Sequence, residues 1–223
     1  MTANAEIAEN MSTPLPRGPH GLTREQVGES QRARLERAFV TLLAERGYSG
    51  VTIGELASLA RVSRAAFYTH FADKQACLFS AYDDFASGLV SAMTAGITEQ
   101  TSWPEFVESA LCGYLGMLEA DRTMARAFLV EMDGAGPEAR ERRRGGVQML
   151  ASMLRDRHEA IREVDPSLAP LPEPIYLGLC LGVRELIRER LEARDPTPLT
   201  NLAPPIVLWA TATVRGAAAA QLD

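Results

Sequence analysis

The chain has 223 residues and a mass of 24.3 kDa, enough for one large or two small domains with hydrophobic cores. Its net charge of −6 and isoelectric point of about 5.2 argue against a protein that is basic throughout. Three widely spaced cysteines argue against a disulfide framework or a metal knuckle, and no apolar run reaches about 18 residues, so we expect a cytoplasmic protein without a membrane span.

Residues 1–22 are polar and rich in Pro and Gly, which predicts a flexible N-terminal arm. An arm that places Arg17 and His20 in the minor groove of DNA is one alternative, and a plain flexible tail is the other. Residues 22–75 carry eight Arg or Lys against six acids, whereas residues 76–223 carry fourteen Arg against twenty-one acids. A mildly basic head on an acidic body suits a protein that docks on phosphate with one end only.

The first predicted helix begins at a capping box of Thr23 and Gln26 and runs to Arg46, where Gly47 ends it. Its apolar face would pack across the next two helices and complete a three-helix head. That face consists of Leu35, Ala38, Phe39, Leu42 and Leu43.

Residues 52–74 predict two short helices joined by a tight turn, followed by the start of a third. The apolar positions of the first helix follow the spacing of one helical face: Ile53, Leu56, Ala57 and Ala60. Thr52 with Glu55 forms a capping box at its start, and Ser63 caps the second helix. Two short helices joined so briefly cross steeply, as in a helix-turn-helix.

Several groups of letters here and nearby form a signature: Gly47-Tyr48, Val51-Thr52-Ile53, Leu56-Ala57, Ala60-Arg61-Val62-Ser63, Phe67-Tyr68-Thr69-His70-Phe71, Asp73-Lys74 and Leu78. They resemble the DNA-binding signature of the tetracycline-repressor-like (TetR/AcrR) family of bacterial regulators over residues 35–78. The chain departs from the family at the turn, where Arg61 replaces the usual glycine. The resemblance implies an all-α fold, with a helix-turn-helix head in residues 23–75 and a larger ligand-binding and dimerisation domain in residues 76–223.

If the second short helix enters the major groove, its outward side chains near the N-terminus reach base edges. Those side chains belong to Arg64, Ala65, Ala66 and Thr69. Arg64 can pair bidentately with guanine, while an alanine methyl or Thr69 can contact a thymine methyl. Arg64 is therefore the predicted sequence reader.

The family resemblance also implies a set of contacts to the DNA backbone. These predicted phosphate-binding residues are Thr52, Ser63, Tyr68, His70 and Lys74. Each of them is a donor type that suits a phosphate oxygen. The alternative is that Tyr68 and His70 lie at the edge of the core and that Lys74 is the solvated end of a loop.

The remainder of the chain predicts further helices separated by Gly- and Pro-rich breaks. We expect these helices at residues 74–93, 104–118, 122–132, 137–164, 174–193 and 204–221. No stretch sustains the period-two alternation of a strand, so the predicted architecture is all-α.

Methionine and aromatic residues in the larger domain could line a cavity for a hydrophobic ligand. The candidates are Trp103, Phe106, Tyr114, Met117, Met124, Phe128, Glu131, Met149, Met153 and Tyr176. The alternative for each methionine is ordinary core packing. The resemblance implies a small-molecule site in this domain without choosing its residues.

The last two predicted helices carry apolar stripes that indicate an association surface. The stripes contain Ile175, Leu179, Gly182, Val183, Leu186, Ile206, Trp209, Ala210, Thr213 and Ala217. The family resemblance implies a four-helix bundle across a two-fold axis, which would place two recognition helices about 34–36 Å apart. Burial of these stripes inside the monomer is the alternative.

Two segments resemble enzyme motifs, but neither has the sequence context that its motif requires. The segment Gly134–Ala139 fits GxGxxA, but a helix precedes it and Glu138 would oppose a pyrophosphate. The segment Gly178–Gly182 imitates a nucleophile elbow inside an apolar helix. With only three histidines, no metal cluster or catalytic triad emerges, so we expect no enzyme activity, cofactor or metal.

The sequence therefore predicts a homodimeric regulator of transcription that binds double-stranded DNA and responds to a small-molecule effector. A repressor released from a near-palindromic operator is the favoured form. The alternative is a helical ligand- or protein-binding module with a degenerate DNA-binding head.

Overall fold

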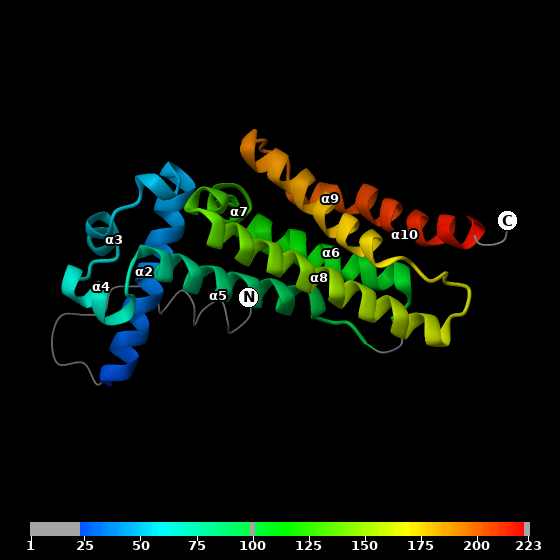
Figure 1. The fold of residues 1–223 in the computed structure, drawn as a ribbon, viewed down its shortest axis with the longest axis horizontal. Coiled ribbons are helices and arrows are strands. Elements are labelled where there is room, and N and C mark those ends of the chain that lie inside the picture. Colours follow the sequence, from blue (N-terminus) through cyan, green and yellow to red (C-terminus); the bar gives the residue numbers. More distant parts are fainter. Residues whose placement is uncertain (1–22, 99–100, 221–223) are drawn as a thin grey trace.

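Figure 1 shows the chain as a computed structural model, which describes residues 23–98 and 101–220, with side chains up to Val214. Every regular element in these residues is helical, which confirms the all-α prediction. A small head lies at one end of an elongated body, and the C-terminal helix ends at the opposite end. The predicted N-terminal arm, residues 1–22, lies outside the described residues.

The head contains the three predicted helices: α2 (Arg24–Arg46), α3 (Ile53–Leu59) and α4 (Arg64–His70), with a 3-10 turn η1 (Tyr48–Gly50). The buried face of α2 packs on α3 and α4, as its apolar pattern predicts. A short link then leads into α5 (Lys74–Thr94), which crosses from the head into the body.

Side-chain caps fix the helix starts where the sequence places them. The hydroxyl of Thr23 accepts from the amide of Gln26 (3.2 Å), and the Gln26 side chain accepts from the Thr23 amide (2.9 Å). Ser63 accepts from the amide of Ala66 (3.0 Å) at the start of α4. These bonds satisfy amides that a helix leaves without partners in its first turn.

The turn between α3 and α4 keeps its left-handed residue although glycine is absent. Arg61 has φ of 55°, in the left-handed region, which costs conformational energy for any residue that has a Cβ. The turn therefore accommodates arginine in the backbone conformation that glycine adopts freely.

The body runs from α5 through a series of long helices and short turns: α6 (Trp103–Ala120), α7 (Arg122–Arg126), the π turn η2 (Ala127–Glu131), η3 (Met132–Ala135), α8 (Pro137–Val164), α9 (Glu173–Glu192), η4 (Leu199–Leu202) and α10 (Ala203–Ala220). The sequence predicts one helix over residues 122–132, but its α-helical part ends at Arg126 and continues as the π turn. The helices α5, α6 and α8 run along the body, and α9 and α10 lie together on one side (Figure 1).

One hydrophobic core joins the head to the near half of the body. It contains Phe39 from α2, Leu78 and Phe85 from α5, and Phe128 from the π turn. A second cluster, around Trp103, Leu179 and Val214, fills the far end. Helix α5 contributes to the first core along most of its length and so packs against both the head and the body. In the described ranges, no helix is long and apolar enough to cross a membrane.

Candidate nucleic-acid interface and effector cavity

Helix α4 is anchored by one ring and leaves most of its other side chains outside. Phe67 is fully buried in the core of the head. The exposed side chains are Arg64, Ala65, Tyr68 and Thr69, and Ala66 is half-buried. None of the residues of α4 is acidic, so this exposed set suits contact with a polyanion.

The guanidinium of Arg64 lies against the preceding helix. A Cβ built on Gly54 of α3 would stand 2.4 Å from Nη2 of Arg64, so the glycine provides the space that this group occupies. The side chain is exposed at the first residue of α4. Arg64 is therefore placed where a base reader stands in a helix-turn-helix, and its base contact stays a prediction.

Thr52 and Ser63 have their hydroxyls engaged at helix N-termini. Thr52 caps α3 by accepting from the Glu55 amide (3.3 Å) and donates its hydroxyl to the Glu55 carboxylate (2.7 Å). Arg46 also donates to this carboxylate (2.6 Å) and, after the Thr52 bond, lowers the pKa of Glu55. Helix N-termini attract phosphate through their backbone amides, so both predicted phosphate contacts remain open to test.

Lys74 connects the head to the first turn of α5. Its Nζ donates to the carbonyls of Tyr48 and Val51, both at 3.1 Å, and stands 4.1 Å from the centre of the Tyr48 ring. The ammonium group is thus held by carbonyls and an aromatic face that stabilise a cation. Its predicted phosphate contact stays a prediction, and the structure adds a role in holding η1 against α5.

His70 and Tyr68 differ in their surroundings. The Nε2 of His70 lies 3.0 Å from Oε1 of Gln31 on α2, so Nε2 donates and a neutral ring has no second N–H for a phosphate. Burial, and then Arg32, lower the pKa of His70, which favours that neutral ring. Tyr68 is 59% exposed and stands edge-on to the Phe67 ring.

An apolar cavity of about 250 Å³ lies in the far half of the body. Helices α5, α6, α8, α9 and α10 line it almost wholly with carbon atoms. Four predicted residues line this cavity: Trp103, Phe106, Tyr114 and Met153. A second cavity of about 40 Å³ adjoins it, and the predicted residues Tyr114, Phe128 and Met149 line that one.

Four predicted lining residues lie elsewhere, because their helices turn them to other neighbours. Met117 packs against Gly88, and Met124 packs on the main core. Glu131 is ion-paired with Arg126 (2.7 Å). Tyr176 is buried with its hydroxyl 2.8 Å from Nδ1 of His158. None of the four lines either cavity, which corrects the sequence-based assignment.

Helix α8 contributes three residues to the larger cavity that the sequence candidates do not include. Leu150, Leu154 and Arg157 line it beside Met153. With Met153, these residues recur three and four positions apart, and that spacing is a signal of one helical face. Arg157 donates to the carbonyls of Thr98 (2.6 Å) and Thr101 (3.2 Å).

The predicted association residues divide into two groups. Leu179, Ile206 and Ala210 are buried within the chain itself, and Val183 lines the larger cavity, so these four belong to the interior of the monomer. Gly182 receives the Trp209 ring of the same chain, since a Cβ there would stand 2.7 Å from it. Ile175 and Thr213 are half-buried, and the side chain of Ala217 lies outside the described residues.

Large apolar side chains nevertheless remain exposed on α9 and α10. They are Leu181, Leu186, Leu208 and Trp209, with Leu208 71% exposed. Two of them, Leu186 and Trp209, belong to the predicted set, while Leu181 and Leu208 do not. Contiguous exposed apolar residues mark association surfaces more often than single ones do.

The described residues offer few groups suited to metal binding or nucleophilic catalysis. No group of three or more His, Cys, Asp or Glu side chains there could hold a metal ion. Burial raises the pKa of Cys180 to about 11, so its thiol stays protonated and is a poor nucleophile. The motif-like segment around Cys180 is an uninterrupted part of α9.

Comparison with known proteins places the head and the fold among bacterial regulators. Residues 37–81 match the sequence model of bacterial regulatory proteins, tetR family. Over 51 residues the chain is 39% identical to the uncharacterized HTH-type transcriptional regulator YerO of Bacillus subtilis (strain 168), an alignment that covers 23% of this chain and 18% of that protein.

Solved structures, among them two FadR regulators, share most of this architecture. The fatty acid degradation regulator FadR from Bacillus halodurans superposes with a TM-score of 0.69 at 18% identity, over 87% of this chain and 95% of that one. The transcriptional regulator FadR from Bacillus subtilis, in complex with stearoyl-CoA, gives 0.66 at 16% identity, over 78% of this chain and 94% of that one. At these identities the likeness concerns the fold.

Proposed function

We propose that this chain, whose residues 37–81 match the model of bacterial regulatory proteins of the tetR family and whose fold resembles that of FadR from Bacillus halodurans, is a homodimeric, cytoplasmic transcriptional repressor. It binds a near-palindromic operator and is released by a small hydrophobic effector. It acts through binding alone, without enzyme chemistry.

The observation that carries this proposal is the exposed, acid-free face of α4 around Arg64. The buried ring of Phe67 anchors α4 to the core of the head, so Arg64 and Thr69 are presented on a rigid element. Arg64 supplies the bidentate guanine contact, and Tyr68 with the helix N-termini positions the head on phosphate.

Dimerisation rests on the exposed apolar residues of α9 and α10. Leu186 and Leu208 stand outside the monomer core, and burial of such side chains favours a second copy. A two-fold axis through these helices sets two α4 helices one turn of DNA apart, about 34–36 Å, which requires a near-palindromic site.

The effector role rests on the apolar cavity of about 250 Å³. Its carbon lining suits an acyl chain, and the Bacillus subtilis FadR of similar fold has been solved with stearoyl-CoA. Helix α5 lines the cavity at Met93 and begins at Lys74, beside the carbonyls of η1. An effector that displaces α5 therefore changes the spacing of the two heads and lowers operator affinity.

The proposal is tested by selecting bound sites from random duplex DNA with the purified protein. We expect a near-palindrome whose affinity falls steeply with salt, and a scrambled duplex that binds at least a hundred times more weakly. Equal retention of both duplexes would instead support the alternative of a degenerate head on a ligand- or partner-binding module.

A further inference from the structure

Arg184 is a half-buried cation of the body that forms no ion pair among the described residues. It lies on α9, and its Nη2 donates to the carbonyl of Leu129 in the π turn η2 (2.8 Å). Within residues 23–98 and 101–214 this is its one hydrogen bond, and it makes no ion pair there. Burial, followed by the charge of Arg143, lowers the pKa of Arg184, and the more distant carboxylates of Asp133 and Glu185 only partly oppose this.

The neighbouring Arg143, unlike Arg184, has an acidic partner. Arg143 lines the same small cavity, but its Nε donates to Oδ1 of Asp133 (2.6 Å) and completes an ion pair. Asp133 acts on Arg184 only through space, by raising its pKa. A negative group placed in the cavity would therefore meet one arginine that is already in an ion pair, Arg143, and one that is not, Arg184.

Two tyrosines line this cavity together with Arg184. Tyr82 from α5 and Tyr114 from α6 line it, and neither hydroxyl has a hydrogen-bond partner among the described residues. The Tyr82 oxygen stands 2.5 Å from a Cβ built on Gly146, another lining residue. Burial raises the pKa of both tyrosines, so both hydroxyls keep their protons and can donate to an anion.

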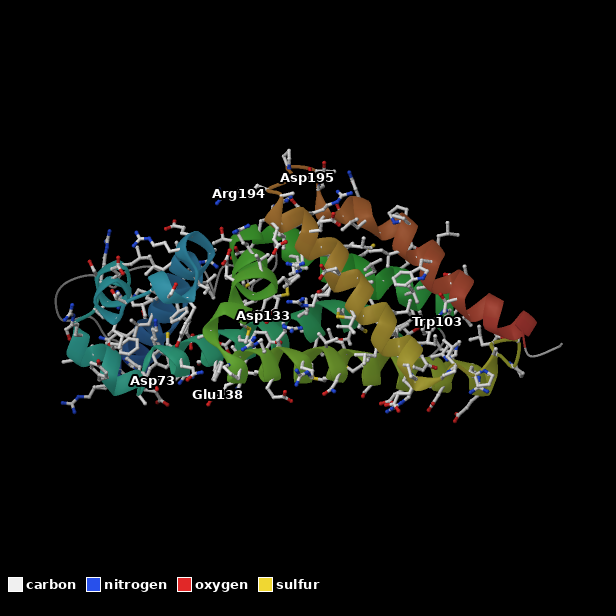
Figure 2. All side chains as sticks on the ribbon, turned by 45° about the horizontal axis from the view of Figure 1, so that its top comes forward. Asp73, Trp103, Asp133, Glu138, Arg194 and Asp195 are labelled. Carbon is white, nitrogen blue, oxygen red and sulfur yellow. The ribbon has the colours of Figure 1, made fainter. Side chains whose placement is uncertain are left out.

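The dimensions of the small cavity suit a carboxylate. Its volume of about 40 Å³ holds roughly three water-sized groups, which matches the three heavy atoms of a carboxylate. Tyr114 and Leu150 line both this cavity and the apolar one. The apolar cavity continues from there to Trp103, at the end of the body away from the head (Figure 2).

We propose that the effector is an amphipathic carboxylic acid, with its carboxylate between Arg184, Tyr82 and Tyr114 and its apolar body in the larger cavity. This proposal rests on the effector role given above and narrows its chemical class. Arg157, which lines the apolar cavity, donates through Nη2 to two backbone carbonyls, while its buried Nε has no partner among the described residues. Arg157 is therefore the competing partner for an anion, and the variant Arg157→Gln tests it.

The test compares two probes that differ only in the headgroup. Dodecanoate, below its micelle concentration, and 1-dodecanol are titrated by calorimetry into the full chain and into Arg184→Gln, Arg184→Lys and Arg157→Gln. We expect the wild type to bind dodecanoate at least ten times more tightly than dodecanol. Arg184→Gln loses that preference without weaker dodecanol binding, Arg184→Lys keeps part of it, and Arg157→Gln keeps it all.

A second pair of measurements separates a folding defect from a binding defect. Tyr114→Phe removes one hydroxyl and little else, and we expect several-fold weaker dodecanoate binding with dodecanol unchanged. Thermal melts check that each variant folds. The proposal is overturned if the wild type binds both probes equally or neither, or if folded Arg184→Gln keeps the preference for the acid.

Binding of the selected duplex by the same preparations keeps this proposal apart from the proposed function. A protein that binds its duplex selectively but does not prefer the acid overturns only the effector class. A protein that prefers the acid through Arg184 but binds no duplex selectively supports the site and overturns the regulator.

Discussion

The guanidinium of Arg126 on α7 donates through Nε to the carbonyl of Ala44 in the last turn of α2 (3.2 Å). The same group donates to the carbonyl of Leu191 near the end of α9 (2.8 Å) and pairs with Glu131 (2.7 Å). One side chain thus joins the C-terminus of a head helix to the C-terminus of a body helix. Arg37 of α2 adds an ion pair to Asp121 at the same junction (2.5 Å).

The junction predicts that Arg126→Ala loosens the head from the body. Removing a partly buried donor to two carbonyls and a carboxylate should lower the free energy of unfolding by about 1–3 kcal/mol. Urea unfolding at pH 7 measures this, and Arg140→Ala on the exposed side of α8 is the matched control. Equal stability of the two variants would show that the junction carries no net energy.

The buried pair of His158 and Tyr176 predicts acid sensitivity. Burial, and then Arg162, lower the pKa of His158 to about 4, below the ordinary 6.5. The folded chain therefore binds fewer protons than the unfolded chain between these values, so this contribution destabilises the fold as pH falls from 6.5 to 4, by up to about 3 kcal/mol. Above pH 6.5 both states hold a neutral ring and the effect vanishes.

The variant His158→Gln isolates this term, because glutamine does not titrate and can still bond the Tyr176 hydroxyl. Unfolding free energies of both proteins, measured from pH 7 to pH 4, should show a steeper fall for the wild type. Parallel curves would assign the acid sensitivity to other groups.

The left-handed turn predicts a stabilising substitution. Arg61→Gly should raise the free energy of unfolding by about 0.5–1 kcal/mol, because relief of the strain at φ of 55° exceeds the entropy that glycine adds to the unfolded chain. Arg61→Ala is the control, since it removes the same charge and keeps the strain. If alanine stabilised the protein as much as glycine, the gain would come from charge.

The exposed face of α9 and α10 predicts a change of oligomeric state. At micromolar concentration we expect the wild type to sediment with twice the chain mass of 24.3 kDa. Leu208→Glu should sediment as a monomer, because a buried carboxylate without a partner opposes association. Leu59→Glu, at an exposed leucine of α3, should leave the dimer intact. A wild-type monomer would refute the dimer.

Local rules predicted the helices well, because capping and periodicity act within a few residues. Thr23 and Ser63 mark real helix starts, and the long helices end near the predicted breaks. The direction in which a helical side chain points depends on distant partners, so the apolar stripes predict Ile206 and Ala210 as association residues although both are buried within the monomer. For the same reason no pattern in α9 predicts Arg184 as a binding residue. It lines a cavity together with tyrosines from α5 and α6, which are distant in the sequence.

The central claim is that α4 reads DNA sequence through Arg64. Fluorescence anisotropy of the selected duplex and of a scrambled duplex, at two salt concentrations, tests it with the wild type and Arg64→Ala. We expect Arg64→Ala to lose about 1–3 kcal/mol on the selected duplex and to bind the scrambled duplex nearly as the wild type does, whereas Lys74→Ala weakens both and lowers the salt slope by about one. Undiminished binding of the selected duplex by Arg64→Ala would contradict the account.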